Sequence, residues 1–318
     1  MDTEERNDQY DPQHAVHTDN GRYYCDPATG EMLVSCTNAL DQHMIEALAP
    51  AAAKATAEWL MDNLPDAIRA AADPDDMEAF TKKAKAQYKV QWDKKADLGS
   101  RVHHIAEAIN LGAPYIPDEE AEPFVESYRK FLSDFGVDIR RGRDIKAAEC
   151  TVLNRTLGYG CTSDIWVNLR FDGPTSPIVP RFKPRAVPAD PIPTPSGLWL
   201  VDIKTSLTKP ASAVYDDHVM QLAAIRNAEV GLACPPECRY GAAEGHDDSH
   251  EFEVPEFVGT AILNLRETTY GFVPLPADAA AFDGFRGLLP LARYVHQLEL
   301  RGYKPVQPPT NTTRKDAA

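Results

Sequence analysis

The chain has few cysteines and no long apolar run. Six cysteines in 318 residues are too sparse for a disulfide scaffold, so we expect reduced thiols. No stretch reaches the roughly 18 uninterrupted apolar residues that a membrane helix needs. Residues 1–9 are polar and acidic, unlike the start of a signal peptide. These absences predict a soluble cytoplasmic protein without a membrane partner.

Basic residues are scarce relative to acids. The chain has 33 Lys and Arg against 48 Asp and Glu, a net charge of −15, which excludes coating of nucleic acid by bulk charge. Three segments, 1–48, 62–79 and 244–256, carry −19 of this charge and leave +4 on the remainder. The acidity is therefore local, and the composition permits a local basic track.

The first half of the chain has the pattern of a hairpin followed by helices. Turn signals at 19–21 and 26–30 predict a hairpin-like start up to about Val34. From Leu40 to about Phe135 the sequence is rich in alanine and predicts helices. Breaks between these helices are expected at 63–65, 73–74 and 112–117.

The second half changes to short β-type runs around one helix. The helix is expected at 214–229, and 230–256 is expected to be an irregular loop. A final helix over 277–298 is expected to kink or break at Pro290. The runs expected as strands are 146–154, 162–171, 198–203, 257–265 and 270–273.

These elements predict an α/β fold, with a central mixed sheet flanked by helices behind a helical N-terminal module. We place the hairpin and helical module at 1–96 and the core at 97–300. The stretch 173–197 contains eight prolines, which exclude a sheet interior and predict a solvated insertion. Residues 301–318 have no apolar period and predict a disordered tail.

Asp202 and Lys204 end an apolar strand. Side chains alternate between faces along a strand, so these two share one face, and Trp199, Val201 and Ile203 take the other. A carboxylate is a hard ligand for Mg²⁺, and a nearby ammonium can stabilise charge on a phosphate, so the pair can act on one centre. The alternative is an ordinary strand end with solvated charges.

Asp164 follows a glycine-containing turn and enters the preceding apolar strand. If the two strands pair, Asp164 and Asp202 converge on one cation. Two carboxylates and several waters suit Mg²⁺ or Mn²⁺, whereas a zinc site would use more histidine or cysteine. The alternative for Asp164 alone is a turn-capping aspartate.

Two predicted helices carry polar side chains beside their apolar stripes. At about 100° per residue, His103 flanks its stripe while His104 points nearly opposite, so His103 is the better ligand candidate. In the helix over 214–229, His218 and Gln221 lie on the inward stripe, so a polar group should meet them. The alternatives are a structural histidine and a glutamine at the edge of the stripe.

The order of these motifs resembles a known nuclease family. Gly-x-x-x-His ends at His103, Gly-x-x-x-Asp ends at Asp164, and Asp-x-Lys-Thr begins at Asp202. Gln221 follows on a helix. Placed on helix, strand, strand and helix, this series resembles the RecB-like branch of the PD-(D/E)XK nucleases, especially its phage and prokaryotic exonucleases. The resemblance runs from about residue 97 to 229 and implies a restriction-endonuclease-like core.

The resemblance implies a role for each motif residue. His103, Asp164 and Asp202 would bind Mg²⁺ or Mn²⁺. The Ile203 carbonyl would assist them, and Lys204 would position or activate the attacking water and stabilise charge on the phosphate.

Two further residues complete this implied site. Gln221 would orient Lys204 or touch the DNA, and Glu149 would support the ligands from outside their set. The implied catalytic set is Asp164, Asp202, Lys204 and Gln221.

Three features depart from the family pattern. The family's helix usually reads Gln-x-x-x-Tyr, whereas the fifth position here is Ile225. The 38-residue spacing from Asp164 to Asp202 is long for a hairpin and needs the proline-rich insertion. Some relatives hold a [4Fe–4S] cluster with a C-terminal cysteine trio, but Cys238 is the last cysteine here, so we expect no cluster.

One loop holds four residues of the types that bind zinc. Their spacing, C-x3-C-x7-H-x3-H, departs from the usual finger, which has about twelve residues between its pairs. Acids and glycines surround them, and we favour the alternative of a solvated loop. The four residues are Cys234, Cys238, His246 and His250.

Basic clusters beside the motifs are candidates for contact with a DNA backbone. Each is also typical of a solvated surface. The candidates are Lys82, Lys85 and Lys89 before His103, and Arg140, Arg141 and Arg143 before the first predicted core strand.

The sequence therefore predicts a metal-dependent DNA exonuclease that hydrolyses phosphodiester bonds with metal-activated water in recombination, repair or processing. Its expected partners are DNA and, as a candidate, a recombination or single-strand-binding protein. Two alternatives stay open. One is a catalytically silent nucleic-acid-binding module of the same fold, which the missing aromatic at Ile225 favours. The other is a structural or scaffolding protein recruited through the acidic N-terminus.

Overall fold

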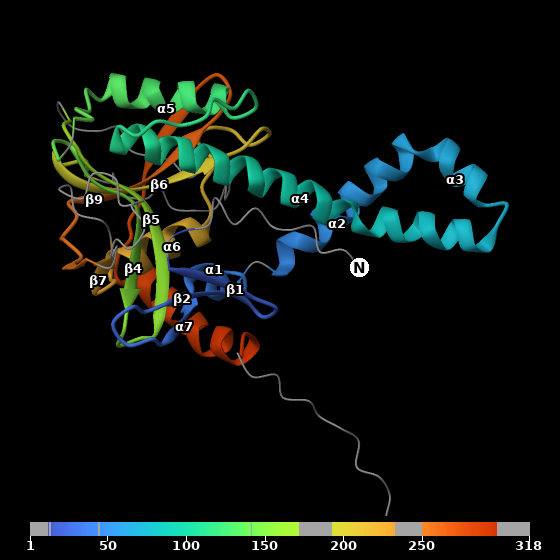
Figure 1. Cartoon of the computed structure of the whole chain (residues 1–318), viewed down its shortest axis with the longest axis horizontal. Coiled ribbons are helices and arrows are strands. Elements are labelled where there is room, and N and C mark those ends of the chain that lie inside the picture. Colours follow the sequence, from blue (N-terminus) through green and yellow to red (C-terminus); the bar gives the residue numbers. More distant parts are fainter. Residues whose placement is uncertain are drawn as a thin grey trace, which may run out of the picture.

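In the computed structural model, helices cover both faces of a mixed sheet, and a helical arm projects from this core (Figure 1). The α/β architecture with a mixed sheet flanked by helices is as expected. No helix in the described part of the chain is long and apolar enough to cross a bilayer. The structure describes Pro12 and residues 14–43, 45–140, 142–171, 193–232 and 250–297.

The strands of the described residues form one sheet with β5 at its centre. Along one path the order is β1-β2-β3-β5-β4-β7-β8, and β6, β9 and β10 branch from the same edge of β5 as β3, farther along that strand. The β3–β5 and β6–β9 pairs are parallel, and the others are antiparallel. The strands are β1 (Ala15–Thr18), β2 (Gly21–Cys25), β3 (Met32–Ser35), β4 (Ile145–Asn154), β5 (Tyr159–Leu169), β6 (Gly197–Thr205), β7 (Val230–Leu232), β8 (Glu251–Glu253), β9 (Gly259–Leu265) and β10 (Tyr270–Pro274).

Two of the long helices have an aspartate at their N-cap. The carboxylate of Asp73 accepts hydrogen bonds from the first turn of α4, with a proline at the first helical position, and Asp278 caps α7. We call α2, α3 and α4 up to Asp97 the arm. The helices are α1 (Cys36–Leu40), α2 (Ile45–Asp62), α3 (Leu64–Ala70), α4 (Pro74–Leu111), α5 (Glu122–Asp134), α6 (Asp216–Arg226) and α7 (Ala279–Val295).

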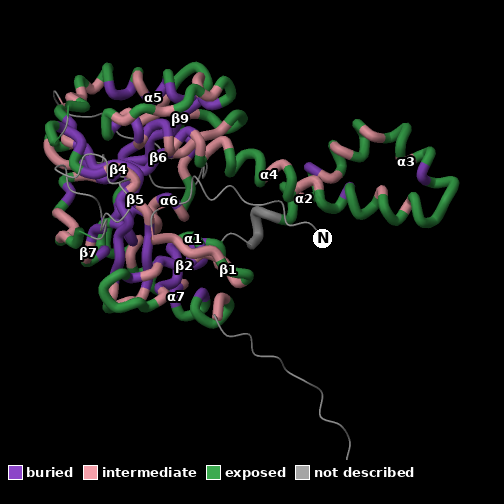
Figure 2. The backbone as a smooth tube through the Cα atoms, viewed as in Figure 1, coloured by how far each residue is buried: buried purple, intermediate pink, exposed green. Residues whose placement is uncertain are grey.

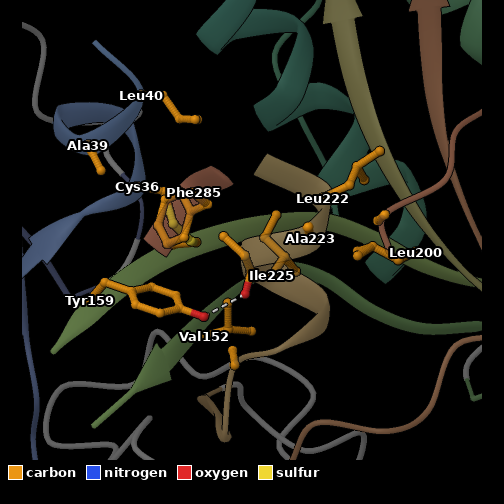
Figure 3. Packing of buried hydrophobic residues seen from close by; sticks show 14 of the residues in the cluster. Cys36, Ala39, Leu40, Val152, Tyr159, Leu200, Leu222, Ala223, Ile225 and Phe285 are labelled. Atoms are coloured by element: carbon orange, nitrogen blue, oxygen red, sulfur yellow. Dashed lines mark hydrogen bonds between the residues drawn. A yellow bond between two sulfur atoms is a disulfide. The ribbon is translucent and has the colours of Figure 1, made fainter. Parts of the chain in front are cut away.

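The sheet separates two apolar cores. Under α5 and the end of α4, Trp199 and Val201 pack with the aromatic rings of Phe131 and Phe272. On the opposite face, α1, α6 and α7 cover a second cluster, where the Tyr159 hydroxyl donates to the Ala224 carbonyl at 2.9 Å (Figure 3). Burial on both faces explains why the central strands read as nearly continuous apolar runs.

Most elements lie where periodicity predicts them, including the N-terminal hairpin and the breaks between α2, α3 and α4. One expectation is wrong. The segment 230–256 is not entirely irregular, because its ends form the paired strands β7 and β8. Of the kink or break expected at Pro290, the break does not occur: α7 runs from Ala279 to Val295, with Phe285, Leu289 and Ala292 buried on either side of the proline.

Cysteine chemistry also differs from expectation. A disulfide joins Cys36 of α1 to Cys161 of β5, 125 residues apart, where we expected reduced thiols. Both cysteines are buried and belong to the cluster of Figure 3. Cys25 and Cys150 are free.

Several expectations fall on residues outside the described ranges. They are most of the proline-rich insertion 173–197, the tail 301–318, Arg141, and three of the four proposed zinc ligands, Cys234, Cys238 and His246.

Candidate metal centre

The site begins where one edge of β5 lacks a paired strand within the described residues. On this edge β3 pairs with Tyr159 and Gly160, and β6 pairs from Ile165 onward, so no described strand pairs with residues 161–164 there. Asp164 lies at the end of the gap and is only 7% exposed. The main-chain N–H of Ile203 donates to its Oδ2 at 2.5 Å in place of a ladder bond. The diverging strands therefore leave a carboxylate inside the sheet.

The two motif glycines permit close approaches beside this gap. A Cβ on Gly160 would lie 2.7 Å from the Tyr24 ring, whose hydroxyl bonds the Thr162 hydroxyl at 2.7 Å. A Cβ on Gly99 would lie 3.3 Å from Thr205 Oγ1 at the end of β6. The glycine–aspartate and glycine–histidine spacings thus reflect packing of the neighbouring elements against the site.

His103 reaches the gap from α4. Its Nε2 lies 3.1 Å from the Ile203 carbonyl oxygen, and its Nδ1 lies 3.1 Å from Glu149 Oε1 and 3.6 Å from Asp164 Oδ1. The neighbouring His104 points to Glu107 at 3.8 Å. The prediction that His103 rather than His104 faces the site is therefore confirmed.

Glu149 enters the cluster through an unusual backbone. In the β4–β5 ladder, Ala148 pairs with Ile165 and Cys150 with Ser163, and the residue between them on β4 is Glu149, with φ at 45°. Left-handed conformations are uncommon and strained for residues other than glycine, and such strain is concentrated at functional sites.

One potential ligand atom from each of His103, Glu149 and Asp164 lies within 4.8 Å of the other two. We expected Glu149 to support the ligands from outside their set. The structure groups it with His103 and Asp164, while Asp202 lies beyond this trio, and the role of Glu149 toward a metal stays a prediction.

Asp202 and Lys204 share a face of β6, as the alternation predicts. Lys204 Nζ lies 2.9 Å from Asp202 Oδ2 and donates to Gln221 Oε1 at 3.0 Å. The expected meeting of Gln221 with a polar group is thus confirmed. Asp202 is 1% exposed, and within the described residues neither of its oxygens receives a hydrogen bond of good geometry.

The charges of the cluster favour a bound cation. Burial raises the pKa of Asp164 to about 8, an effect that His103 opposes and that Asp202 and Glu149 strengthen. His103 and Lys204 are the cationic neighbours of the three carboxylates in this buried site. A divalent cation would take the place of a bound proton among them and offer a partner to Asp202 Oδ1, which has none within the described residues.

The same carboxylates raise the pKa values of His103 and Lys204. Burial lowers the pKa of His103, but Asp164 and Glu149 outweigh burial and raise it to about 10. Burial likewise lowers the pKa of Lys204, and Asp202 and Asp164 reverse this and raise it. One imidazole and two carboxylates together form a donor set that fits a divalent cation.

The remaining motif residues have different surroundings. His218 of α6 is buried, its ring meets Tyr215 edge-on at 5.2 Å, and its Nδ1 has no partner within the described residues. Burial lowers its pKa. Ile225, where the family has tyrosine, is fully buried among Leu222 and Tyr159. In this chain that position belongs to the core.

The candidate DNA contacts lie outside the cluster. Lys82, Lys85 and Lys89 are exposed on the arm. Arg140 pairs with Asp138, and Arg143 is exposed.

Arg266 is a residue that sequence reasoning missed. It follows β9, is 8% exposed, and donates to the carbonyls of Lys204 at 3.2 Å, Lys209 at 2.6 Å and Pro210 at 2.8 Å. These bonds hold the link between β6, which carries Lys204, and α6, which carries Gln221. No local pattern marks it, because these three carbonyls lie more than fifty residues away.

No protein-family model matches this chain, and no curated protein matches it. The chemistry assigned to the site therefore rests on its own residues.

Proposed function

We propose that this protein is a metal-dependent DNA nuclease with a restriction-endonuclease-like core of the RecB-like PD-(D/E)XK type. The observation that carries this proposal is Lys204, which contacts Asp202 and donates to Gln221, beside the cluster of His103, Glu149 and Asp164. Cation ligands next to a lysine suit metal-assisted hydrolysis of a phosphodiester. Exonuclease action in recombination, repair or processing is the form we propose, with Mg²⁺ or Mn²⁺ as the metal.

His103 would serve as a ligand through Nδ1. Its Nε2 lies 3.1 Å from the Ile203 carbonyl, so the ring would donate there and, once a metal displaced the other proton, offer Nδ1 on the side of Glu149 and Asp164. Metal-binding histidines commonly donate their second N–H to a carbonyl, which fixes the ring. The Ile203 carbonyl then orients His103, in contrast to the direct metal contact expected from the family.

Lys204 would stabilise charge on the phosphate rather than remove a proton from water. Its raised pKa keeps the ammonium protonated at neutral pH. Gln221 and Asp202 hold that ammonium from two sides. When bound, a divalent cation would supply the activation of water and further neutralisation of the phosphate.

DNA is the partner we propose, with a recombination or single-strand-binding protein as a further candidate, and the cytoplasm is the proposed location.

Nuclease assays on end-labelled linear DNA and circular DNA, each with Mg²⁺, Mn²⁺ or EDTA, test the proposal. We expect metal-dependent loss of linear DNA. Asp202→Ala and Lys204→Ala should reduce the rate by at least about a hundredfold, since each removes charge stabilisation at the reacting phosphate. Lys130→Ala and Asp283→Asn, exposed on α5 and α7, should retain the wild-type rate.

The outcomes separate the alternatives. Wild-type cleavage by a folded Asp202→Ala or Lys204→Ala variant would remove the proposed site. Circular DNA cut as fast as linear DNA would exclude an exonuclease. DNA binding without cleavage in Mn²⁺ would indicate the silent binding module, and failure to bind DNA at low salt would indicate a scaffolding protein.

Calorimetric titration with Mn²⁺ tests the ligand set without relying on activity. Glu149→Gln and Asp164→Asn should each weaken Mn²⁺ binding by about 10- to 100-fold, because each replaces a carboxylate of the cluster with an uncharged amide. The control is Glu126→Gln, an exposed carboxylate on α5. Wild-type affinity in the Glu149→Gln protein would return the ligand role to Asp202.

A further inference from the structure

The arm has no apolar core of its own. It projects away from the sheet (Figure 1), and Figure 2 shows it exposed or half-buried almost throughout. Among its described side chains, the buried ones are those of Ala55, Ala70 and Ala84. Even Trp59 and Phe80, whose ring centroids lie 5.1 Å apart, stay half-buried. Most helical stability in proteins comes from packing of an apolar face, so the arm has a surface available for a partner.

The outer end of the arm exposes a group of large apolar side chains, which we call the tip patch. It spans the end of α2 and the short helix α3. Contiguous apolar surface on a soluble protein marks an interaction site. The members are Leu60, Met61, Leu64 and Ile68, which are 36%, 70%, 47% and 68% exposed.

Charge is segregated along the arm. Residues 62–79, at the outer end, carry a net −5, and residues 80–95, on the part of α4 nearer the core, carry +5. Within the part of the chain that the structure describes, the ion pairs between two arm residues are Lys54–Glu58 and Arg69–Asp66, and Asp97 pairs with Arg101. The six lysines of 80–95 are exposed and belong to neither pair.

We infer that the arm is a homodimerisation element that pairs with the arm of a second copy of this chain in antiparallel fashion. A two-fold axis across α4 places the −5 end of each arm on the +5 segment of the other. The same contact covers the tip patch of both copies. Complementary charge fixes the antiparallel orientation, and the apolar side chains provide the area that is removed from water.

DNA is the competing occupant of the lysine segment. A duplex backbone would meet the lysines, but it would be repelled by the six acids of 62–79 and would offer no apolar surface to Leu64 and Ile68. A second arm satisfies all three features at once.

Sedimentation equilibrium of the full chain tests the inference through reciprocal charge reversal. The tip variant carries Asp75→Lys, Asp76→Lys and Glu78→Lys. The stem variant carries Lys82→Glu, Lys83→Glu and Lys85→Glu. All six positions are exposed, so both proteins should fold.

Wild type should sediment at twice the monomer mass at roughly 50 mM salt and dissociate at about 500 mM, where charges are screened. Each variant alone should dimerise at least about tenfold more weakly, because like charges then face each other. An equimolar mixture of the two variants should recover the dimer, since each reversed segment meets its complement.

Two matched variants complete the design. Leu64→Gln with Ile68→Gln should also weaken the dimer by removing the tip patch. Asp283→Lys with Arg286→Glu, an exposed pair on α7, should leave the dimer unchanged. A monomeric wild type at every accessible concentration, or a mixture that fails to recover the dimer, would overturn the inference. A stem variant that keeps its dimer but loses DNA binding would assign the lysines to DNA instead.

Discussion

One helix, α4, belongs to both the core and the arm, and different interactions stabilise it in the two regions. The last part of α4 buries Val102, Ile105 and Ala106 against the sheet, whereas between Pro74 and Asp97 the buried side chain is that of Ala84. Helix formers and the Asp73 cap suffice to continue the helix outward. Tertiary packing in the core thus holds the site in place, while local propensity in the arm extends a charged surface.

Aromatic truncation provides the largest contrast between the two regions. Phe131→Ala should lower the free energy of unfolding by about 3–5 kcal/mol, because the ring is fully buried and stacks on Phe272 at 5.8 Å. Trp59→Ala in the arm should cost about 1 kcal/mol, because its ring is half-buried and has Phe80 as its aromatic partner. Urea unfolding followed by circular dichroism measures both, and equal costs would mean that the arm has a core.

Breaking a buried ion pair should have the next largest effect on the free energy of unfolding, and this effect should depend on pH. Asp26 is 1% exposed, and its carboxylate accepts hydrogen bonds from Arg155 at 2.7 and 2.8 Å, which lower its pKa to about 2. Its folded pKa lies below the ordinary value, so the stabilisation is present above about pH 4 and is lost as pH falls through about 2. Asp26→Asn should cost about 2–3 kcal/mol at pH 7, and the difference should shrink in acid.

Asp138 supplies the matched control for that experiment. Its hydrogen bonds from Arg140 also lower its pKa to about 2, but the pair lies at the surface, where solvent screens it. Asp138→Asn should therefore leave the urea midpoint nearly unchanged at every pH. A shift as large as that of Asp26→Asn would show that burial does not decide the cost.

Helix caps give the smallest effect and compare the regions directly. Asp73 caps α4 in the arm by accepting from Asp75 N at 2.8 Å, and Asp278 caps α7 on the core by accepting from Ala281 N at 3.0 Å. Removing either cap should cost about 1 kcal/mol of helix stability. Asp73→Ala should speed hydrogen exchange only in the arm, while Asp278→Ala should lower global stability. A global loss from Asp73→Ala would contradict the independence of the arm.

Local patterns could predict the elements and part of the site. Strand alternation places Asp202 and Lys204 on one face, and helical periodicity turns His103 and Gln221 toward them. The sequence places Glu149 on the strand before Asp164, as observed, but no composition or period reveals the left-handed backbone that turns it toward His103 and Asp164.

Contacts between segments far apart in the chain could not be predicted either. The Cys36–Cys161 bridge and the carbonyls that Arg266 binds are set by the sheet topology. Strands β7 and β8 have three residues each, too few for a periodic signal.

The continuity of α4 has a consequence for how this chain can vary. The helix runs from Pro74 to Leu111, so Lys82 and His103 share one rigid screw axis. Deleting a single residue between them would rotate the arm by about 100° about this axis relative to the histidine. The lysines would then face another direction even though every side chain remained. Insertions and deletions in this stretch should therefore be tolerated only in numbers close to whole helical turns.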